Sequence, residues 1–203
     1  MTRKDELEIE YWKSAISKDF SVRYKKALEL FGVNSIDYMG EVMDWGCGPF
    51  FGILPYLNSN WKEAVDPLWD QYFQRFGNVL DKFGEDTLCF TIDDFSPGED
   101  DPIDTIFTIN SIDHGNSDFS VLNTFHKLLK PGGKVYLHVH LRTPEQLNDG
   151  HDHCLTYEDY LKNKEGLFEV IKETIYDRDP LPIEDNEAVT DRYKTLITVL
   201  KKI

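Results

Sequence analysis

The chain places acidic side chains and glycines where a nucleoside could bind. Asp44-Trp45-Gly46-Cys47-Gly48 follows a short apolar run, and a second apolar run ends at Asp66. Glycines let a ligand approach bare backbone, and a carboxylate after the second run can accept both hydroxyl groups of a ribose. Position 51 is Phe, so the third glycine of a dinucleotide-binding loop is missing, and the phosphate loop Gly-Lys-Ser/Thr is absent as well. The pattern therefore favours a nucleoside without phosphates.

Three ordered motifs resemble those of class I S-adenosylmethionine-dependent methyltransferases. They are the glycine segment with its downstream Asp66, the apolar run 103–109 with its loop 110–114, and the segment 121–137 around Pro131-Gly132-Gly133. The resemblance implies S-adenosylmethionine as cofactor and a single-domain Rossmann-like fold. Its sheet would have seven mostly parallel strands in the order 3-2-1-4-5-7-6, with helices on both faces and the last strand antiparallel. Periodicity alone indicates only an α/β protein with a mostly parallel sheet.

The resemblance also implies roles for individual residues around the cofactor. The methionine end would lie on the turn, the ribose on the acid of the second strand, and the adenine between apolar and acidic groups; these residues are Asp44, Gly46, Cys47, Gly48, Asp66, Pro67, Leu68, Asp93 or Asp94, and Asn110. Simpler interpretations stay open. Asp66 could cap a helix that begins at Pro67, Cys47 could merely occupy the turn, and the acids at 93 and 94 could belong to a solvated loop.

Histidines are the candidate bases, because neutral imidazole can take a proton from a hydroxyl group near neutral pH. We expect His114, after the fourth strand, to be the first choice, with His140 and His153 as alternatives. His138 and His140 alternate on one strand and share a face, whereas His126 is expected to be structural. The run His151-Asp152-His153-Cys154 crowds its ligands into one short loop, so no metal site is predicted.

The periodicity predicts helices over residues 3–31, ended by Gly32, and helices opened at Pro49 and Pro67. Strands are predicted near 41–45, 61–65, 88–91, 103–109, 134–140, 168–176 and 193–200. A helix over 120–130 would be stopped by Pro131-Gly132-Gly133, and Thr156 would cap another. Residues 1–39 would cover the active site of a cofactor-binding domain formed by 40–203, with Tyr11, Trp12 and Tyr24 either lining an acceptor pocket or packing on the core.

Composition limits the partners. The formal net charge is −15, with 37 acidic and 22 basic residues, which disfavours nucleic acid because phosphate contacts need a basic surface. No apolar run is long enough for a membrane helix and the N-terminus is charged, so a cytoplasmic protein, monomeric or homodimeric, is expected. The acidic segment 177–191 favours neutral or cationic acceptors if it borders the pocket.

The leading hypothesis is methyl transfer to oxygen or nitrogen of a small-molecule or sugar-like acceptor, including secondary metabolites. Two alternatives stay open. One is aminopropyl transfer to a polyamine, which the acidic surface would suit, and the other is a regulatory or partner protein that binds S-adenosylmethionine without turnover. Intact motifs at Asp44–Gly48 and Asp66 support ligand binding, but they do not distinguish an enzyme from a binding protein.

Overall fold

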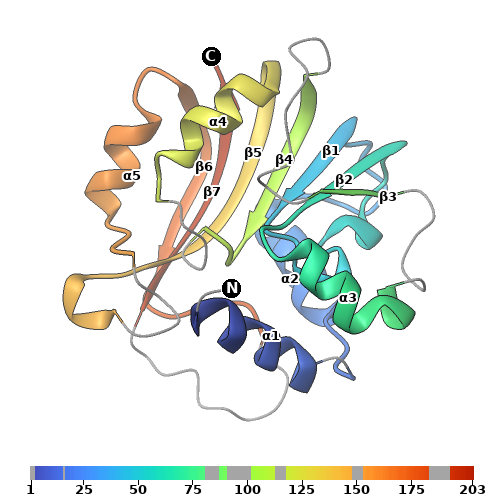
Figure 1. Cartoon of the computed structure of the whole chain (residues 1–203). Helices are drawn as coiled ribbons and strands as arrows, with labels where there is room; N and C mark the ends of the chain where they lie inside the picture. Colours follow the sequence, from blue (N-terminus) through green and yellow to red (C-terminus); the bar gives the residue numbers. More distant parts are fainter. Residues whose placement is uncertain are drawn as a thin grey trace.

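The protein has an α/β Rossmann-like fold built on one mixed β-sheet (Figure 1), which confirms the predicted fold class. The structure is a computed structural model that describes residues 3–15, 17–80, 87–90, 102–112, 118–147, 153–182 and 193–203. His114, Asp93 and Asp94 lie outside these ranges. Among the described residues, no helix is both long and apolar enough to cross a membrane.

The sheet order is β3-β2-β1-β4-β5-β7-β6. Neighbours are parallel from β3 to β5, and β7 pairs antiparallel with both β5 and β6. The strands are β1 (Glu41–Trp45), β2 (Trp61–Val65), β3 (Thr87–Phe90), β4 (Ile103–Ile109), β5 (Leu129–Leu141), β6 (Phe168–Tyr176) and β7 (Lys194–Lys202). Strands β1 and β4 are buried over most of their length, as expected for strands covered on both faces.

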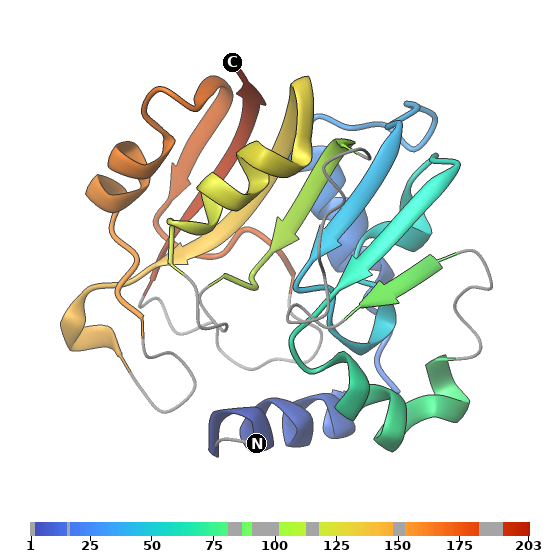
Figure 2. The ribbon, with the colours of Figure 1, turned by 45° about the horizontal axis from the view of Figure 1, so that its top comes forward.

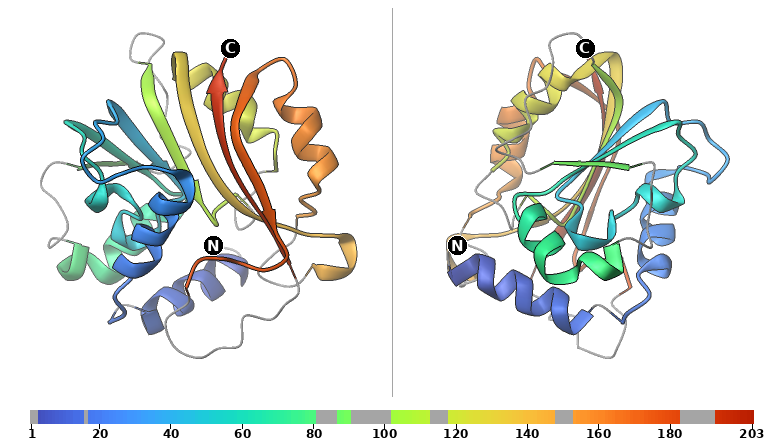
Figure 3. Two further views of the ribbon diagram at one scale, coloured as in Figure 1. Left: turned by 180° about the vertical axis from the view of Figure 1, so that it is seen from behind. Right: turned by 45° about the vertical axis from the view of Figure 1, so that its right-hand side comes forward.

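Helices cover both faces of the sheet (Figure 3), and each face has its own apolar core. Helices α4 (Val121–Leu128) and α5 (Tyr157–Lys164) pack on one face through residues such as Phe125 and Tyr160. Helix α2 (Ser21–Phe31) packs on the other through Leu28 and Phe31. The predicted caps hold: Gly32 ends α2 in the left-handed conformation, and the Thr156 side chain accepts a hydrogen bond from the Asp159 amide.

Helix α1 (Arg3–Ala15) lies across the carboxyl edge of the parallel strands, at the end of the molecule opposite the C-terminus (Figures 1 and 2). Its Ile9 is 2% exposed and packs with Leu68, Tyr72 and Phe76, which belong to α3 (Trp69–Leu80) and the turn before it. The carboxyl edge of a parallel sheet is where ligands bind in such folds, so α1 covers the region where the candidate site residues gather.

Two predicted helix boundaries were wrong. Pro49 opens only the 3-10 turn Gly48–Phe50, followed by a second one at Leu54–Tyr56, because Phe51 and Gly52 both take positive φ and interrupt a helix. The helix predicted for 120–130 ends at Leu128. The backbone is already extended at Leu129, and Pro131-Gly132-Gly133 forms an irregular start of β5 rather than a separate turn.

Candidate functional site

Asp44 is a buried carboxylate at the carboxyl end of β1. It is 2% exposed, and its Oδ2 accepts a hydrogen bond of 2.9 Å from the Ile53 amide. Gly52 has φ +48, and a Cβ there would overlap the same carboxylate oxygen, so only glycine fits. Burial raises the pKa of Asp44 to about 7 against the lowering effect of the Ile53 hydrogen bond, and the nearby Asp66 charge adds to the rise.

Asp66 joins the two halves of the predicted nucleoside motif. Its Oδ2 accepts a 2.9 Å hydrogen bond from the Gly48 amide, and its Oδ1 accepts one of 2.9 Å from the Leu68 amide. The bond from Leu68 is the local cap expected if Asp66 only caps a helix. The bond from Gly48 ties the end of β2 to the turn Gly46–Gly48, here called the glycine turn. Burial raises the pKa of Asp66 to about 6 despite these two hydrogen bonds, and the charge of Glu8 adds to the rise.

The glycine turn is closely packed by the protein itself. Gly46 has φ +76, and a Cβ there would collide with the Ser111 side chain. At Gly48, which has φ +62, a Cβ would lie 2.9 Å from the Trp12 ring. Cys47 is buried, and its Sγ contacts the Gly48 carbonyl oxygen at 3.2 Å, so its thiol occupies the turn. Both glycines are therefore required before any ligand is considered.

Asn110 follows β4 with a left-handed backbone, φ 51, an uncommon conformation for a residue other than glycine. Its amide donates a 2.9 Å hydrogen bond to the His138 carbonyl oxygen, which continues the β4–β5 pairing to the end of the sheet. The next residue, Ser111, bonds back to the Trp45 carbonyl oxygen at 2.8 Å. The loop after β4 is thus fixed against both the glycine turn and β5.

The other cofactor candidates differ in exposure. Leu68 is buried at 8% exposure within the α1–α3 contact, whereas Pro67 is exposed. Tyr24 stacks on Tyr56 with ring centroids 5.9 Å apart, and burial and then the Asp44 charge raise the pKa of its hydroxyl. Tyr11 is 50% exposed. Of the three aromatic residues predicted to line a pocket or pack on the core, Trp12 has the closest contact with the glycine turn.

A second polar group lies at the carboxyl end of β5. The Nε2 atoms of His138 and His140 are 2.9 Å and 3.2 Å from the two oxygens of Asp179, which follows β6. The ionised carboxylate can only accept, so both Nε2 atoms carry the proton. Asp179 also accepts a 2.9 Å hydrogen bond from the Leu181 amide and lies 3.4 Å from Arg23 of α2.

The pKa values in this group follow from its contacts. Burial alone would raise the pKa of Asp179, but hydrogen bonds from His138 and His140 and the charge of Arg23 lower it far below its usual range. Burial lowers the pKa of His138, against the opposing effect of Asp179, so the ring is neutral. Arg142 Nη2 lies 3.4 Å from His140 Nδ1 and its guanidinium covers the Tyr193 ring at 4.2 Å. The group therefore holds two guanidinium charges against one carboxylate.

His138, His140 and Asp179 could in principle hold a metal ion, since their ligand atoms lie within 4.8 Å of one another. Two observations disfavour this. Both Nε2 protons are already directed at the carboxylate, and a metal ion would lie beside Arg23 and Arg142. The hydrogen bonds explain the grouping without an ion.

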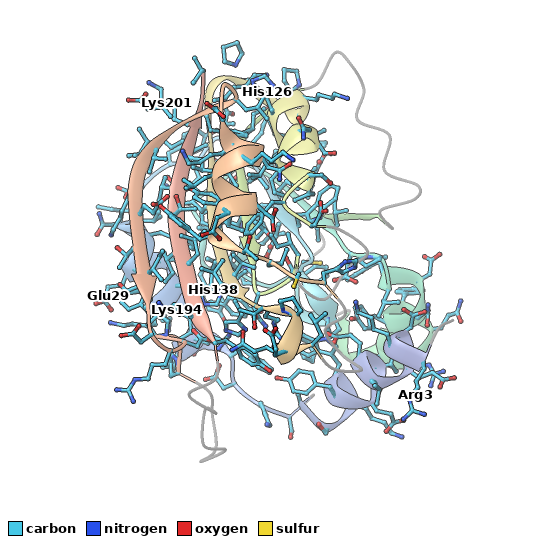
Figure 4. All side chains as sticks on the ribbon, turned by 90° about the vertical axis from the view of Figure 1, so that its left-hand side faces the viewer. Arg3, Glu29, His126, His138, Lys194 and Lys201 are labelled. Carbon is cyan, nitrogen blue, oxygen red and sulfur yellow. The ribbon has the colours of Figure 1, made fainter. Side chains whose placement is uncertain are left out.

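The remaining histidines are dispersed. Figure 4 shows His126 at the opposite end of the sheet from His138, and His126 packs edge-on against Phe168, as a structural residue would. His153 lies near Asp118, just before α4. The pKa of Asp118 is lowered mainly by hydrogen bonds from Ser120, and His153 adds to the lowering. The structure therefore gives His140 and His153 different neighbours. Sequence reasoning missed Arg23, Arg142 and the role of Asp179, because nothing distinguishes Asp179 from the other acids of its segment.

Comparison with known proteins identifies the fold. No protein-family model matches the chain, and no curated protein matches it. Solved structures do match. A complex between the Haloferax volcanii Trm112 methyltransferase activator and a chain described as the putative methyltransferase matches with a TM-score of 0.68 at 16% identity, covering 100% of this chain and 98% of that chain. This chain has the class I methyltransferase fold.

Two further structures of this fold carry ligands. The N-methyltransferase NodS from Bradyrhizobium japonicum, bound to S-adenosylhomocysteine, has a TM-score of 0.64 at 11% identity and covers 96% of this chain and 98% of that chain. The geranyl diphosphate C-methyltransferase from Streptomyces coelicolor, bound to Mg²⁺, geranyl diphosphate and S-adenosylhomocysteine, has a TM-score of 0.64 at 11% identity, covering 96% and 86%. Their acceptors differ, so the class I methyltransferase fold does not identify the acceptor of this chain.

Proposed function

We propose that the protein is an S-adenosylmethionine-dependent methyltransferase that acts on a small-molecule or sugar-like acceptor at oxygen or nitrogen. The observation that carries the proposal is the pair of buried carboxylates, Asp44 and Asp66, on either side of the glycine turn in a class I methyltransferase fold. S-adenosylhomocysteine in solved structures of this fold supports the choice of cofactor.

In this proposal the cofactor residues keep the roles expected from the sequence. Asp44 attracts the cationic methionine end, Asp66 accepts ribose hydroxyls, and Leu68 contacts the adenine. S-adenosylmethionine supplies the methyl group and the positive charge that disappears on transfer. The protein then provides alignment of the acceptor with the methyl group and, for a hydroxyl acceptor, a base.

His140 is the candidate base that the described residues support best, with His114 and His153 as alternatives. It lies at the carboxyl end of β5, its side chain is 15% exposed, and Asp179 holds its Nε2 proton. Its Nδ1 then presents a lone pair. The 3.4 Å contact between that atom and Arg142 is at the weak limit of a hydrogen bond, so an acceptor hydroxyl can replace it.

Calorimetry with S-adenosylmethionine, S-adenosylhomocysteine and NAD tests the cofactor. We expect both S-adenosyl compounds to bind and NAD not to bind. Tight NAD binding without affinity for S-adenosylmethionine would refute the proposal. Screening of acceptors for release of S-adenosylhomocysteine then separates a methyltransferase from a regulatory binding protein. With decarboxylated S-adenosylmethionine as donor and a polyamine as acceptor, release of methylthioadenosine would identify aminopropyl transfer instead.

A further inference from the structure

Helix α1 reaches the glycine turn through Trp12. The ring atoms nearest to a Cβ built on Gly48 are Cζ2 at 2.9 Å, Cε2 at 3.3 Å and Cη2 at 3.4 Å. The ring also meets Phe50 edge-on, with centroids 5.6 Å apart. All three atoms belong to the six-membered ring of the indole, and Cε2 is also bonded to Nε1.

Glu8 is held at the N–H side of this ring. Trp12 Nε1 donates a 2.7 Å hydrogen bond to Glu8 Oε1, one helical turn earlier on α1. The Gly48 amide donates a hydrogen bond to Asp66. The contacts therefore run from Asp66 through Gly48 and Trp12 to Glu8, which places two carboxylates from different elements around one short stretch of backbone.

Tyr72 on α3 is buried near both acids. It is 1% exposed, and burial, followed by the charges of Asp66 and Glu8, raises the pKa of its hydroxyl. Its ring packs with Leu68 and Ile9. Glu8 and Asp66 are thus close enough for the charge of Glu8 to raise the pKa of Asp66, with Trp12 and Gly48 between them.

We propose that α1 supplies a wall of the nucleoside site, in which Glu8 accepts a hydrogen bond from a ribose hydroxyl opposite Asp66 and Trp12 positions Glu8. This inference rests on the proposed function and adds two residues to its cofactor site. A ribose carries two vicinal hydroxyl donors, so two carboxylates can each accept one of them.

The test is calorimetric binding of S-adenosylhomocysteine and its 2′-deoxy and 3′-deoxy analogues to wild type, Glu8→Ala and Glu10→Ala. Glu10 is the matched control, because it lies on the same helix with a 67% exposed side chain. We expect Glu8→Ala to weaken S-adenosylhomocysteine about tenfold or more and Glu10→Ala to change it less than twofold. One deoxy analogue should bind Glu8→Ala and wild type nearly equally, because it lacks the hydroxyl that Glu8 accepts.

Trp12→Phe tests positioning. It keeps an aromatic side chain but removes the indole N–H donor, so affinity should fall in the wild-type background and fall no further in Glu8→Ala. Glu8→Gln serves if Glu8→Ala does not fold. Wild type that fails to bind S-adenosylhomocysteine would refute the proposed function and this inference together. Normal wild-type binding with equal behaviour of Glu8→Ala and Glu10→Ala, or an equal loss for every analogue, would refute the role of Glu8 alone.

Discussion

Buried acids at the two ends of the carboxyl edge have pKa values shifted in opposite directions. At β1 and β2, Asp44 and Asp66 accept hydrogen bonds from backbone amides, and burial raises both pKa values. Beside β5, Asp179 accepts hydrogen bonds from two histidines and from the Leu181 amide. Arg23 also lies beside it, and the pKa of Asp179 is lowered. Burial is similar, so the difference lies in the hydrogen-bond donors and charges that surround each acid.

This difference separates a binding group from a positioning group. A carboxylate with a raised pKa gains much when a ligand brings a positive charge or hydroxyl donors, because that ligand compensates for lost water. For Asp179 the protein itself replaces the lost water, because its oxygens accept hydrogen bonds from His138 and His140. We therefore propose ligand binding at the β1–β2 end and orientation of a reacting histidine at the β5 end.

The largest expected effect is at the β5 end. His140→Ala should lower kcat about 100-fold or more for a hydroxyl acceptor, the scale of a lost general base, while the affinity for S-adenosylhomocysteine stays unchanged. The measurement is steady-state kinetics together with calorimetry. His126→Ala, at the other end of the sheet, is the control. A kcat within a few fold of wild type would remove His140 from the mechanism and return attention to His114 and His153.

At the β1–β2 end, Asp66→Ala should weaken S-adenosylhomocysteine by about 1.5–3 kcal/mol, or roughly 10- to 150-fold, the scale of hydrogen bonds to a charged group. Calorimetry measures the change, and circular dichroism shows whether the variant is folded. The matched control is Asp70→Ala, which alters an exposed acid in the first turn of α3. Unchanged affinity in a folded Asp66→Ala protein would contradict its assignment as a ligand-binding residue.

The raised pKa values of Asp44 and Asp66, about 7 and about 6, predict that cofactor binding depends on pH. Binding favours the ionised carboxylates, so affinity should rise between pH 5.5 and 7.5 and level off above pH 8. The free protein responds in the opposite direction. Because both folded pKa values exceed the ordinary value of 3.8, these groups lose their contribution to stability as pH rises through 6 and 7.

Affinity for S-adenosylhomocysteine at four pH values, with thermal unfolding of the free protein at the same values, checks this prediction. Asp44→Asn should remove the part of the binding transition near pH 7 and leave the part near pH 6. An affinity that is constant from pH 5.5 to 8.5 would show that neither acid changes ionisation on binding.

The smallest effect is expected from metal removal. Activity should survive EDTA, because the protons of His138 and His140 are directed at Asp179 and Arg23 lies beside it. The measurement is turnover before and after chelation, with added Mg²⁺, Mn²⁺ and Zn²⁺ as separate arms. Loss of activity that one of these ions restores would overturn the hydrogen-bonded interpretation of the β5 end.

The sequence indicates the proximity of Asp44, the glycine turn and Asp66 better than the grouping around Asp179, for a physical reason. Asp44, the glycine turn and Asp66 are close in sequence and joined by local strand–turn geometry, so their spacing predicts their proximity. The Asp179 group depends on contacts across the fold: His138 is 41 residues from Asp179 and Arg23 is 156. Such contacts leave no local pattern. The same limit explains why the strand segments follow from periodicity, whereas the placement of α1 on Gly48 does not.

The insertion of β7 between β5 and β6 has a consequence for how the chain folds. Strand β6 pairs with β7, and β7 pairs in turn with β5, for example Leu137 with Thr198. Closing that pair encloses the chain between the two strands, and the free-energy cost of the lost conformational entropy is offset only after the contacts have formed. We therefore expect β5–β7 pairing to form late in folding. Since His138 and His140 lie on β5 and Asp179 lies within the enclosed segment, the contacts between these three residues would form in this late step.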